Sequence, residues 1–304
     1  MATTEIFLPV ENYDLGATLD SGQVFRWRPA GNSWLGVLGK HPLRLTQLPT
    51  GIRAQSDVPI ASWNFLKEFL QSDVDLAAIL KTFPDDEPMR AALFASPGLR
   101  LLRQDPWECL ASFILSSTKQ IVQIRQIIDL LCQKFGEDCC GIENQNESTR
   151  TCGITARTFP TVQRLATCTE TELRDCKMGF RAPNLLATAR LVAGGAVDLT
   201  RMRSLDHASA RAELMKLPGV GGKIADCVLL FACGFDAAFP VDVWIERALQ
   251  ELYFPRRRAS EKRLRKLAAT HFGPHAGYAQ QYLFHYMRTK QFAAVKHGKP
   301  PGRQ

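Results

Sequence analysis

Lys223 and Asp242 are the residues of this sequence whose types and spacing could do chemistry. Lys223 ends the segment Leu217-Pro218-Gly219-Val220-Gly221-Gly222-Lys223, and Asp242 follows nineteen residues later in Pro240-Val241-Asp242. An uncharged lysine amine can attack carbon, and an ionised carboxylate can stabilise positive charge that develops during the attack. The pair therefore predicts a nucleophile with an electrostatic partner.

The segment before Lys223 has the composition of a turn between two helices. Apolar residues repeat at helical spacing on both sides of it: Leu205, Ala208, Ala212 and Met215 before it, and Ile224, Cys227, Val228 and Phe231 after it. Pro218 stops the first helix, and Gly219 and Gly221 can adopt positive φ at little steric cost. Free backbone amides at such a turn can bind an anion such as a DNA phosphate.

The predicted helices place both chemical groups at helix N-termini. Lys223 begins the second helix of the hairpin, where the helix dipole disfavours an ammonium group. Asp242 precedes the amphipathic run Val243, Ile245, Leu249 and Leu252, so it is also expected to be an N-cap, worth about 1 kcal/mol. Capping and catalysis are compatible, because an N-cap carboxylate stays ionised and fixed in direction.

The hairpin has two other possible interpretations. A nucleotide-binding P-loop needs a hydroxyl residue after its lysine, but Ile224 stands there, and Leu217 replaces its first glycine. A glycine-rich connector without a ligand remains possible from the hairpin alone, and Asp242 makes it less attractive. The combination indicates an enzyme that acts on DNA.

The hairpin, Lys223 and Asp242 resemble the helix-hairpin-helix DNA glycosylase superfamily, and other segments resemble its eukaryote-type 8-oxoguanine DNA glycosylases. These segments span nearly the whole chain in the family's order: Ser21-Gly22-Gln23-Val24-Phe25-Arg26-Trp27, Gln104-Asp105-Pro106-Trp107-Glu108-Cys109, Gly179-Phe180-Arg181-Ala182 and Tyr278-Ala279-Gln280-Gln281-Tyr282-Leu283-Phe284. The resemblance implies a DNA glycosylase that extrudes the damaged base into a pocket.

The resemblance assigns roles to pocket residues. Gly22 matches the residue whose main-chain carbonyl accepts the N7 hydrogen that 8-oxoguanine has and guanine lacks. Phe284 and Cys227 match the two walls that sandwich the base, and Gln280 the amide that reads its pairing edge. Lys223 would attack C1′ of the sugar and Asp242 would stabilise the developing charge. The expected product is a Schiff base, which makes the enzyme both a glycosylase and an AP lyase.

The residues expected to contact the opposite strand depart from the family pattern. Ser116-Ser117-Thr118-Lys119-Gln120 replaces an asparagine run that fills the hole left by the extruded base, so Thr118 and Lys119 are the candidates to fill it. Gln123 replaces an arginine that reads the orphaned cytosine, whereas Arg181 matches the second such arginine. Because one of two bidentate donors is lost, discrimination should weaken by about 1–3 kcal/mol.

Trp244 is a further departure, because it replaces a histidine that touches a phosphate near the lesion. Its indole can donate one hydrogen bond but carries no charge. It is predicted either to contact DNA or to pack at the start of its helix.

Two other functions stay open. Helix-hairpin-helix units also clamp DNA in proteins without catalysis, but these need neither Lys223 nor Asp242. A related glycosylase for alkylated, mismatched or otherwise damaged bases is the other alternative, although members that act on labile alkylated bases can dispense with the lysine.

The charge of the chain supports a nucleic-acid partner. Net charge is +8, but residues 251–304 hold 12 Lys/Arg and 2 Asp/Glu, which leaves 26 and 28 in the first 250. The basic character therefore lies near the C-terminus, where it can meet phosphates. No apolar run approaches 18 residues, and the first residues lack a basic signal-peptide head. We expect an intracellular monomer bound to damaged double-stranded DNA and to no membrane.

The nine cysteines show no pair of CxxC motifs, and none follows Cys233. An odd count without a secretory signal indicates reduced thiols. Several relatives hold an iron–sulfur cluster with four cysteines after the catalytic region. This chain cannot build that cluster, so no cofactor is expected. The host stays open, so the predicted location is the nucleus of a eukaryote or the cytoplasm and nucleoid of a bacterium.

The predicted fold class is α+β. Short alternating apolar runs separated by turn residues, from 5 to about 85, predict an antiparallel sheet, and helical spacing dominates from about 98. The expected domains are a β-rich unit over 1–97 that contributes to the base pocket, helical glycosylase domains over 98–295 with the helix-hairpin-helix at about 204–234, and a flexible tail over 296–304.

Overall fold

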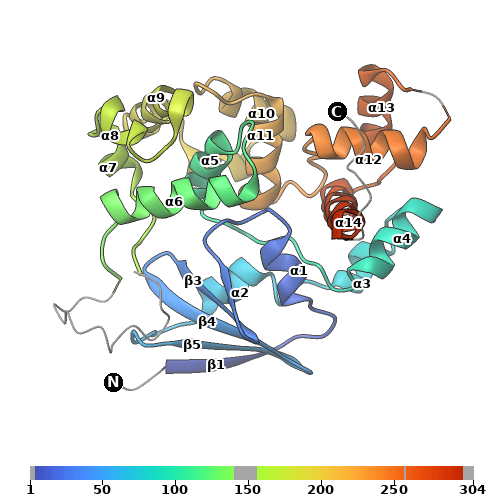
Figure 1. Cartoon of the computed structure of the whole chain (residues 1–304), viewed down its shortest axis with the longest axis horizontal. Helices are drawn as coiled ribbons and strands as arrows, with labels where there is room; N and C mark the ends of the chain where they lie inside the picture. The colour runs from blue at the N-terminus through green and yellow to red at the C-terminus, as the bar shows by residue number, and fades with distance from the viewer. Residues whose placement is uncertain (1–3, 140–155, 257, 297–304) are drawn as a thin grey trace.

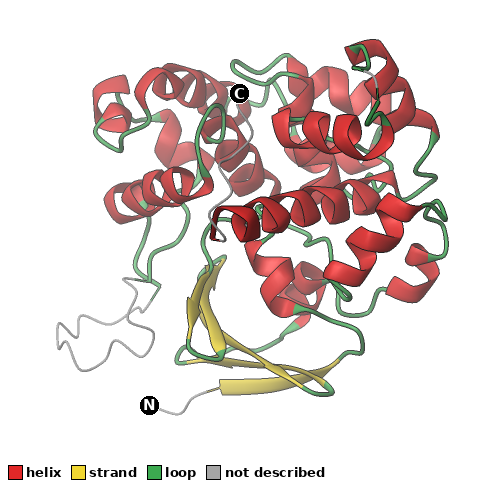
Figure 2. Cartoon of the chain, turned by 45° about the vertical axis from the view of Figure 1, so that its right-hand side comes forward, coloured by secondary structure: helices red, strands yellow, loops and turns green. Residues whose placement is uncertain are grey.

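The computed structural model describes residues 4–139, 156–256 and 258–296. A five-stranded sheet lies at one end of the molecule and helices pack above it (Figures 1 and 2). The predicted α+β class, with an N-terminal antiparallel sheet followed by a mostly helical region, is confirmed.

The sheet is antiparallel throughout, in the order β1-β5-β4-β3-β2. Its strands are β1 (Thr4–Pro9), β2 (Arg28–Ala30), β3 (Ser33–Leu38), β4 (His41–Leu48) and β5 (Gly51–Ser56). Tight turns join β2 to β3 and β3 to β4. They are possible because Gly31 and Gly39 take φ of +60° and +58°, the region that glycine enters without strain. The sheet ends at Ser56, so the prediction of strands up to about residue 85 was wrong.

Helices occupy the rest of the N-terminal region. The missed elements are α1 (Leu15–Asp20), α2 (Asn64–Leu70), α3 (Leu76–Leu80) and α4 (Glu87–Ala95). Aspartate N-caps start three of them; Asp14, for example, accepts a hydrogen bond from the Ala17 amide at 2.8 Å. These helices are short, so their apolar periodicity was too brief to distinguish from strand alternation.

The remaining helices follow the predicted spacing. They are α5 (Pro106–Leu115), α6 (Ile121–Phe135), α7 (Val162–Ala166), α8 (Glu170–Arg174), α9 (Ala182–Ala193), α10 (His207–Met215), α11 (Gly222–Val228), α12 (Val243–Tyr253), α13 (Glu261–Thr270) and α14 (Ala276–Lys296). Short 3-10 helices occur at Gly179–Arg181 and Leu199–Ser204, and α11 continues as a π-helical turn over Leu229–Cys233.

Two apolar cores hold these elements together. The smaller core packs the sheet against α1 and α2 through fully buried residues such as Leu19, Leu43, Ile52 and Leu66. The larger core joins α3 and α4 to the helices from α5 onward. The domain boundary at 97 stays a prediction. Of the predicted tail over 296–304, Lys296 ends α14 and the rest lies outside the described residues.

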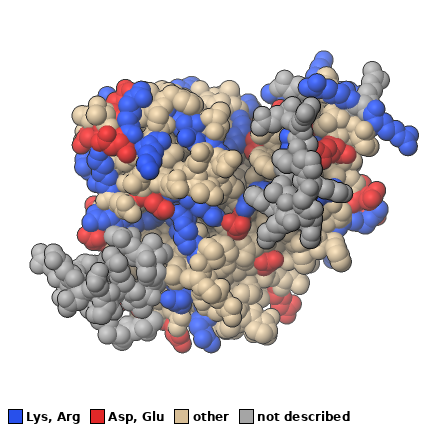
Figure 3. All heavy atoms as spheres, viewed as in Figure 1, with Lys and Arg blue, Asp and Glu red and all other residues tan. Residues whose placement is uncertain are grey.

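The charges of the described surface are unevenly placed. Figure 3 shows Lys and Arg gathered over α13, where Lys262, Arg263, Arg265 and Lys266 are all exposed. Within the described ranges, no helix combines the length and apolarity needed to cross a bilayer.

Candidate active site

The predicted hairpin lies between α10 and α11. Helix α10 ends at Met215, before Pro218, and Gly221 is the N-cap of α11. Gly219 has φ of +79°, and a Cβ there would lie 2.8 Å from the Asn184 side chain, so this position needs glycine. Gly221 has φ of −92°, so the expected positive φ was wrong there; a Cβ at this position would meet nothing within 4 Å, so the space beside this N-cap is open.

The amino group of Lys223 points toward the protein. Its Nζ donates to Ser116 Oγ at 3.4 Å and lies 4.9 Å from the centre of the Phe113 ring. The side chain is half-buried at the first turn of α11. Ser116 in turn donates to the Phe113 carbonyl at 2.7 Å, which fixes the acceptor near the amine. The amine is therefore held beside helix α5 while it stays within reach of solvent.

Asp242 is the N-cap of α12, as predicted. Its Oδ1 accepts hydrogen bonds from the amides of Trp244 and Ile245 at 3.0 and 2.9 Å. Within the described part of the chain, no donor reaches Oδ2. One carboxylate oxygen is thus used for structure, and the other is left for a ligand.

Cys227 connects the two groups, because its thiol lies within electrostatic reach of both. Burial raises the pKa of Cys227 to about 12; the Lys223 ammonium opposes this rise, also as a hydrogen-bond donor, and the Asp242 carboxylate adds to it. Cys227 is 3% exposed on the apolar face of α11. Lys223 and Cys227 thus lie one turn apart on α11, and the charges of Lys223 and Asp242 act on the thiol in opposite directions.

Gly22 and Phe284 form a second group of predicted pocket residues. Gly22 has φ of +82°, and a Cβ there would lie 3.1 Å from Ile121 Cδ1 and 3.3 Å from Phe284 Cε1. Gln280 lies one turn before Phe284 on α14 and is 4% exposed; among the described residues, its Oε1 has no hydrogen-bond donor. A buried acceptor beside an aromatic wall suits recognition of a base edge.

The segment from Ser116 to Ile121 runs between the two groups. Ser116 contacts Lys223 and Ile121 faces Gly22. Between them, Thr118 adopts φ of +54°, an uncommon conformation for a threonine, and Lys119 donates its amide to the Ser116 carbonyl. The candidate gap-filling residues therefore lie in a tight turn beside the lysine.

Arg181 is folded inward, although it was predicted to read a DNA base. Its Nη2 donates to the Ser117 carbonyl and to Thr118 Oγ1, the latter at 2.6 Å, and the residue is 3% exposed. Burial lowers the pKa of Arg181. Its guanidinium lies 4.2 Å from the centre of the Phe180 ring, which is 61% exposed.

Gln123 and Trp244 lie at helix starts. Gln123 Oε1 accepts the Gln120 amide at 3.2 Å and so caps α6, a role that an arginine could not perform. Trp244 is half-buried, and the Arg247 guanidinium lies 6.0 Å from the centre of its ring. Both the packing and the DNA-contact interpretations of Trp244 stay open.

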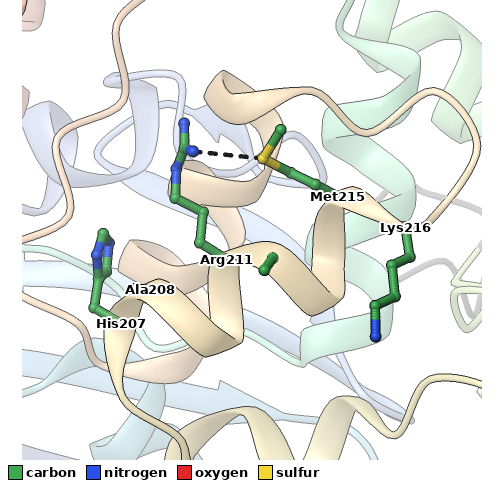
Figure 4. Close-up of a pocket in the computed structure, with 6 residues that line it drawn as sticks. His207, Ala208, Arg211, Met215 and Lys216 are labelled. Carbon is green, nitrogen blue, oxygen red and sulfur yellow. Dashed lines mark hydrogen bonds between the residues drawn. The ribbon is translucent and has the colours of Figure 1, made fainter.

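One predicted apolar face proved to be at the surface. Ala208, Ala212 and Met215 are exposed and line a hollow on α10 with Arg211 (Figure 4). The buried face of α10 carries Ala210 and Leu214 instead. The helical period was right but its phase was wrong, because alanine does not distinguish an interior from a surface.

Sequence reasoning missed several contacts of the site. Phe113 and Ser116 touch Lys223, and Asp20 and Arg288 lie beside Gly22. Ser116 belongs to the segment that contains Thr118 and Lys119, the candidates to fill the hole left by the extruded base. Its position in that segment was a usable signal that it lies in the site. The other three carry no local pattern.

Comparisons with known proteins cover most of the chain. Residues 5–110 match the family model of the 8-oxoguanine DNA glycosylase N-terminal domain, and residues 111–274 match that of HhH-GPD superfamily base excision DNA repair proteins. A probable N-glycosylase/DNA lyase of Methanothermobacter thermautotrophicus is 30% identical over 92% of this chain and 95% of its own. The N-glycosylase/DNA lyase OGG1 of Arabidopsis thaliana is 29% identical over 92% of this chain and 77% of its own.

A solved structure is similar over nearly the full length. The 8-oxoguanine glycosylase/lyase of Clostridium acetobutylicum, in complex with double-stranded DNA that has cytosine opposite 8-oxoguanine, superposes with a TM-score of 0.84 at 30% identity. The match covers 96% of this chain and 99% of that one.

Proposed function

The chain belongs to the HhH-GPD superfamily of base excision DNA repair proteins, and from this membership we propose that it removes 8-oxoguanine from duplex DNA and then cleaves the strand at the abasic site. Its residues 5–110 match the domain named for 8-oxoguanine DNA glycosylases. Relatives of similar length are named N-glycosylase/DNA lyases. The proposal is thus a bifunctional enzyme.

One observation carries the proposal to this chain's own residues. The Lys223 amine lies against Ser116 and Phe113, next to a buried thiol that also feels the Asp242 carboxylate. The nucleophile therefore lies at the end of a hairpin with open space beside Gly221, and the proposed stabilising anion acts on the same thiol. This arrangement suits attack on a sugar whose phosphate the hairpin holds.

In the proposed reaction the nitrogen of Lys223 bonds to C1′ while the bond from C1′ to the base breaks. The base leaves with that electron pair and takes up a proton. Asp242 stabilises the positive charge that develops on the sugar. Loss of a proton from the amine and opening of the sugar ring give a Schiff base, and removal of a C2′ proton then expels the 3′ phosphate.

Base recognition falls to the second group of residues. We propose that the Gly22 carbonyl accepts the N7 hydrogen of 8-oxoguanine and that Gln280 reads the pairing edge. Phe284 and Cys227 would sandwich the ring. Guanine has a lone pair at N7, so it would face the carbonyl with two acceptors and no hydrogen, which a buried site does not tolerate.

The proposed enzyme works as a monomer on DNA inside the cell and needs no iron–sulfur cluster. The sequence has no cysteine after Cys233, so the four ligands that cluster-bearing relatives place there are missing. The reaction above uses only an amine, a carboxylate and the substrate.

An incision assay tests the function. Duplexes with 8-oxoguanine opposite each of the four bases are incubated with the protein, with and without alkali. Cleavage without alkali indicates both activities, and cleavage only after alkali indicates glycosylase alone. An intact 8-oxoguanine strand beside cleavage of another damaged or mismatched base would favour the related glycosylases, and binding without any cleavage a passive DNA clamp.

The role of Lys223 has its own test. Lys223→Gln should bind damaged duplex but give no covalent adduct with borohydride, because only a primary amine forms the reducible Schiff base. Lys216→Gln is the matched control, since this exposed lysine is the C-cap of α10 and, among the described residues, its ammonium pairs with Glu213 of that helix. An adduct at normal yield with Lys223→Gln would remove the assignment.

A further inference from the structure

From residue 20 to residue 23, each backbone carbonyl except that of Gly22 accepts a hydrogen bond from a side chain. Arg288 donates to the Asp20 carbonyl at 2.6 Å, Gln281 to the Ser21 carbonyl at 2.9 Å, and Gln104 to the Gln23 carbonyl at 2.7 Å. Among the described residues, no donor reaches the Gly22 carbonyl. The loop is therefore clamped around one acceptor that is left for a ligand.

Asp20 is the point where this clamp joins three elements. Its Oδ1 accepts from Arg125 of α6 at 2.8 Å, and its Oδ2 accepts from Arg288 of α14 at 3.0 Å. The two arginine side chains are 17% and 12% exposed, whereas Asp20 is 42% exposed. Asp20 itself ends α1, two residues before Gly22.

The two guanidinium groups depend on this carboxylate. Burial lowers the pKa of Arg288 and the Arg125 charge lowers it further, whereas Asp20 raises it. Without Asp20, the carboxylate that binds both the Arg125 and the Arg288 guanidinium would be gone, and the repulsion between these two largely buried cations would shift their side chains. Arg288 lies 3.5 Å from the position of a Cβ on Gly22, so its movement would reach the pocket directly.

We propose that Asp20 is a positioning residue of the lesion pocket, which fixes the Gly22 carbonyl toward the extruded base by holding Arg125 and Arg288 together. The inference rests on the proposed function, since it concerns how that base is recognised. Arg125 lies on α6, the helix that also carries Gln123. Asp20 therefore connects the proposed lesion pocket with a residue predicted to face the opposite DNA strand. Base recognition needs a fixed acceptor, and a displacement of about 1 Å can cost about 100-fold in rate.

The test compares two reactions of the same protein. Asp20→Ala should lower single-turnover excision of 8-oxoguanine about 10- to 100-fold. Cleavage of a preformed abasic site, which has no base to recognise, should change less than about 2-fold, since the amine and Asp242 are untouched. A merely structural role would lower both reactions together.

A control variant and a second test variant show whether an effect is specific to the pairing of Asp20 with its arginines. Asp129→Ala removes a comparable aspartate, 48% exposed and paired with Arg28 at 2.7 Å, and should change neither reaction. Arg288→Lys can reach only one of the two Asp20 acceptors, so it should lower the ratio of excision to abasic-site cleavage about 3- to 10-fold. Asp20→Asn keeps one of the two side-chain acceptors and removes the charge, so its ratio should fall between those of Asp20→Ala and the wild type.

The outcomes separate the two proposals. Wild-type protein that leaves 8-oxoguanine intact would contradict the proposed function. Active wild type with an unchanged ratio in Asp20→Ala would overturn the role of Asp20 alone. If Asp20→Ala does not fold, the ratio in Arg288→Lys and in Arg125→Leu decides, and an unchanged ratio in both overturns the inference.

Discussion

The two sides of the candidate site are built differently. The lesion side, residues 20–23 with Gln280, Gln281, Phe284 and Arg288, is tied to α14 and to the segment before α5 by hydrogen bonds on the carbonyls of Asp20, Ser21 and Gln23. The opposite-base side, residues 116–120 with Gln123 and Arg181, is a turn with one threonine at positive φ and an arginine folded onto it.

This difference matches the two recognition tasks. In the proposed function a single hydrogen atom separates the lesion from guanine at the Gly22 carbonyl, so that acceptor would have to be fixed before the base arrives. The opposite base can be read by side chains that move into place, because arginine carries its donors on a long stem. Substitutions on the lesion side should therefore mainly lower the rate of excision. Substitutions on the opposite-base side should mainly change the preference for the opposite base.

The largest effect is expected from Gly22→Ala. A methyl group 3.1 Å from Ile121 at φ of +82° must shift the carbonyl, so excision of 8-oxoguanine should fall about 100-fold. The free energy of unfolding should fall by about 1–2 kcal/mol because the left-handed conformation is strained. Single-turnover kinetics and urea unfolding measure the two effects. Retention of wild-type excision would show that the lesion side is not rigid.

Arg181→Ala should have a smaller effect on rate and a clear one on selectivity. Loss of the remaining arginine should reduce the preference for cytosine over adenine opposite the lesion about 10-fold. The same change removes two hydrogen bonds to the 117–118 turn, so stability should fall by about 1–2 kcal/mol. Excision rates on duplexes with each opposite base give the ratio. If the ratio does not change, Arg181 serves only the fold of the free protein.

Gln123→Arg tests the same side by adding a donor. The preference for cytosine should rise about 10-fold, since one bidentate contact is worth about 1–3 kcal/mol. The variant loses the cap that Gln123 provides to the Gln120 amide, at a cost of about 0.5–1 kcal/mol in stability. A stability loss without any gain in preference would mean that this position does not reach the opposite strand.

The smallest effect is a pH dependence on the lesion side. Burial and the Arg288 charge lower the pKa of His285 from its ordinary value near 6.5, although Asp20 and Asp14 oppose the shift. Below pH 6.5 the unfolded chain binds a proton that the folded chain does not, so the free energy of unfolding should fall as pH falls from 7.5 to 5.5.

His285→Gln should reduce this slope, an effect of about 1 kcal/mol or less over the range. Urea unfolding at three pH values measures it. His41, whose pKa burial also lowers, keeps part of the slope in the variant. An identical slope in both proteins would indicate that His285 takes up its proton in the folded state.

The sequence predicted the residues that carry local patterns. Glycines in turns, the lysine after the hairpin and the capping aspartate all have short-range signatures, and Gly219, Lys223 and Asp242 lie where those signatures place them. The sheet was predicted by alternation up to Ser56, beyond which helices of five to nine residues imitate the same pattern.

Long-range pairs had no such signature. Asp20 meets Arg125 and Arg288 from 105 and 268 residues away, and nothing in the spacing of charged residues selects those partners. The inward fold of Arg181 was equally hidden, because it depends on a carbonyl of a distant turn. Catalytic types can be read along the chain, whereas the contacts that position them are set by packing.

The buried thiol of Cys227 bears on how this protein resists oxidation. An enzyme that repairs oxidised guanine meets the same peroxides that damaged the base, and thiolates are the protein groups that peroxides attack first. With its pKa raised to about 12, Cys227 stays protonated at neutral pH, and each of the seven cysteines that the structure describes is buried. In the proposed pocket, Cys227 can thus contact the base without reacting with the oxidants that produce the lesion.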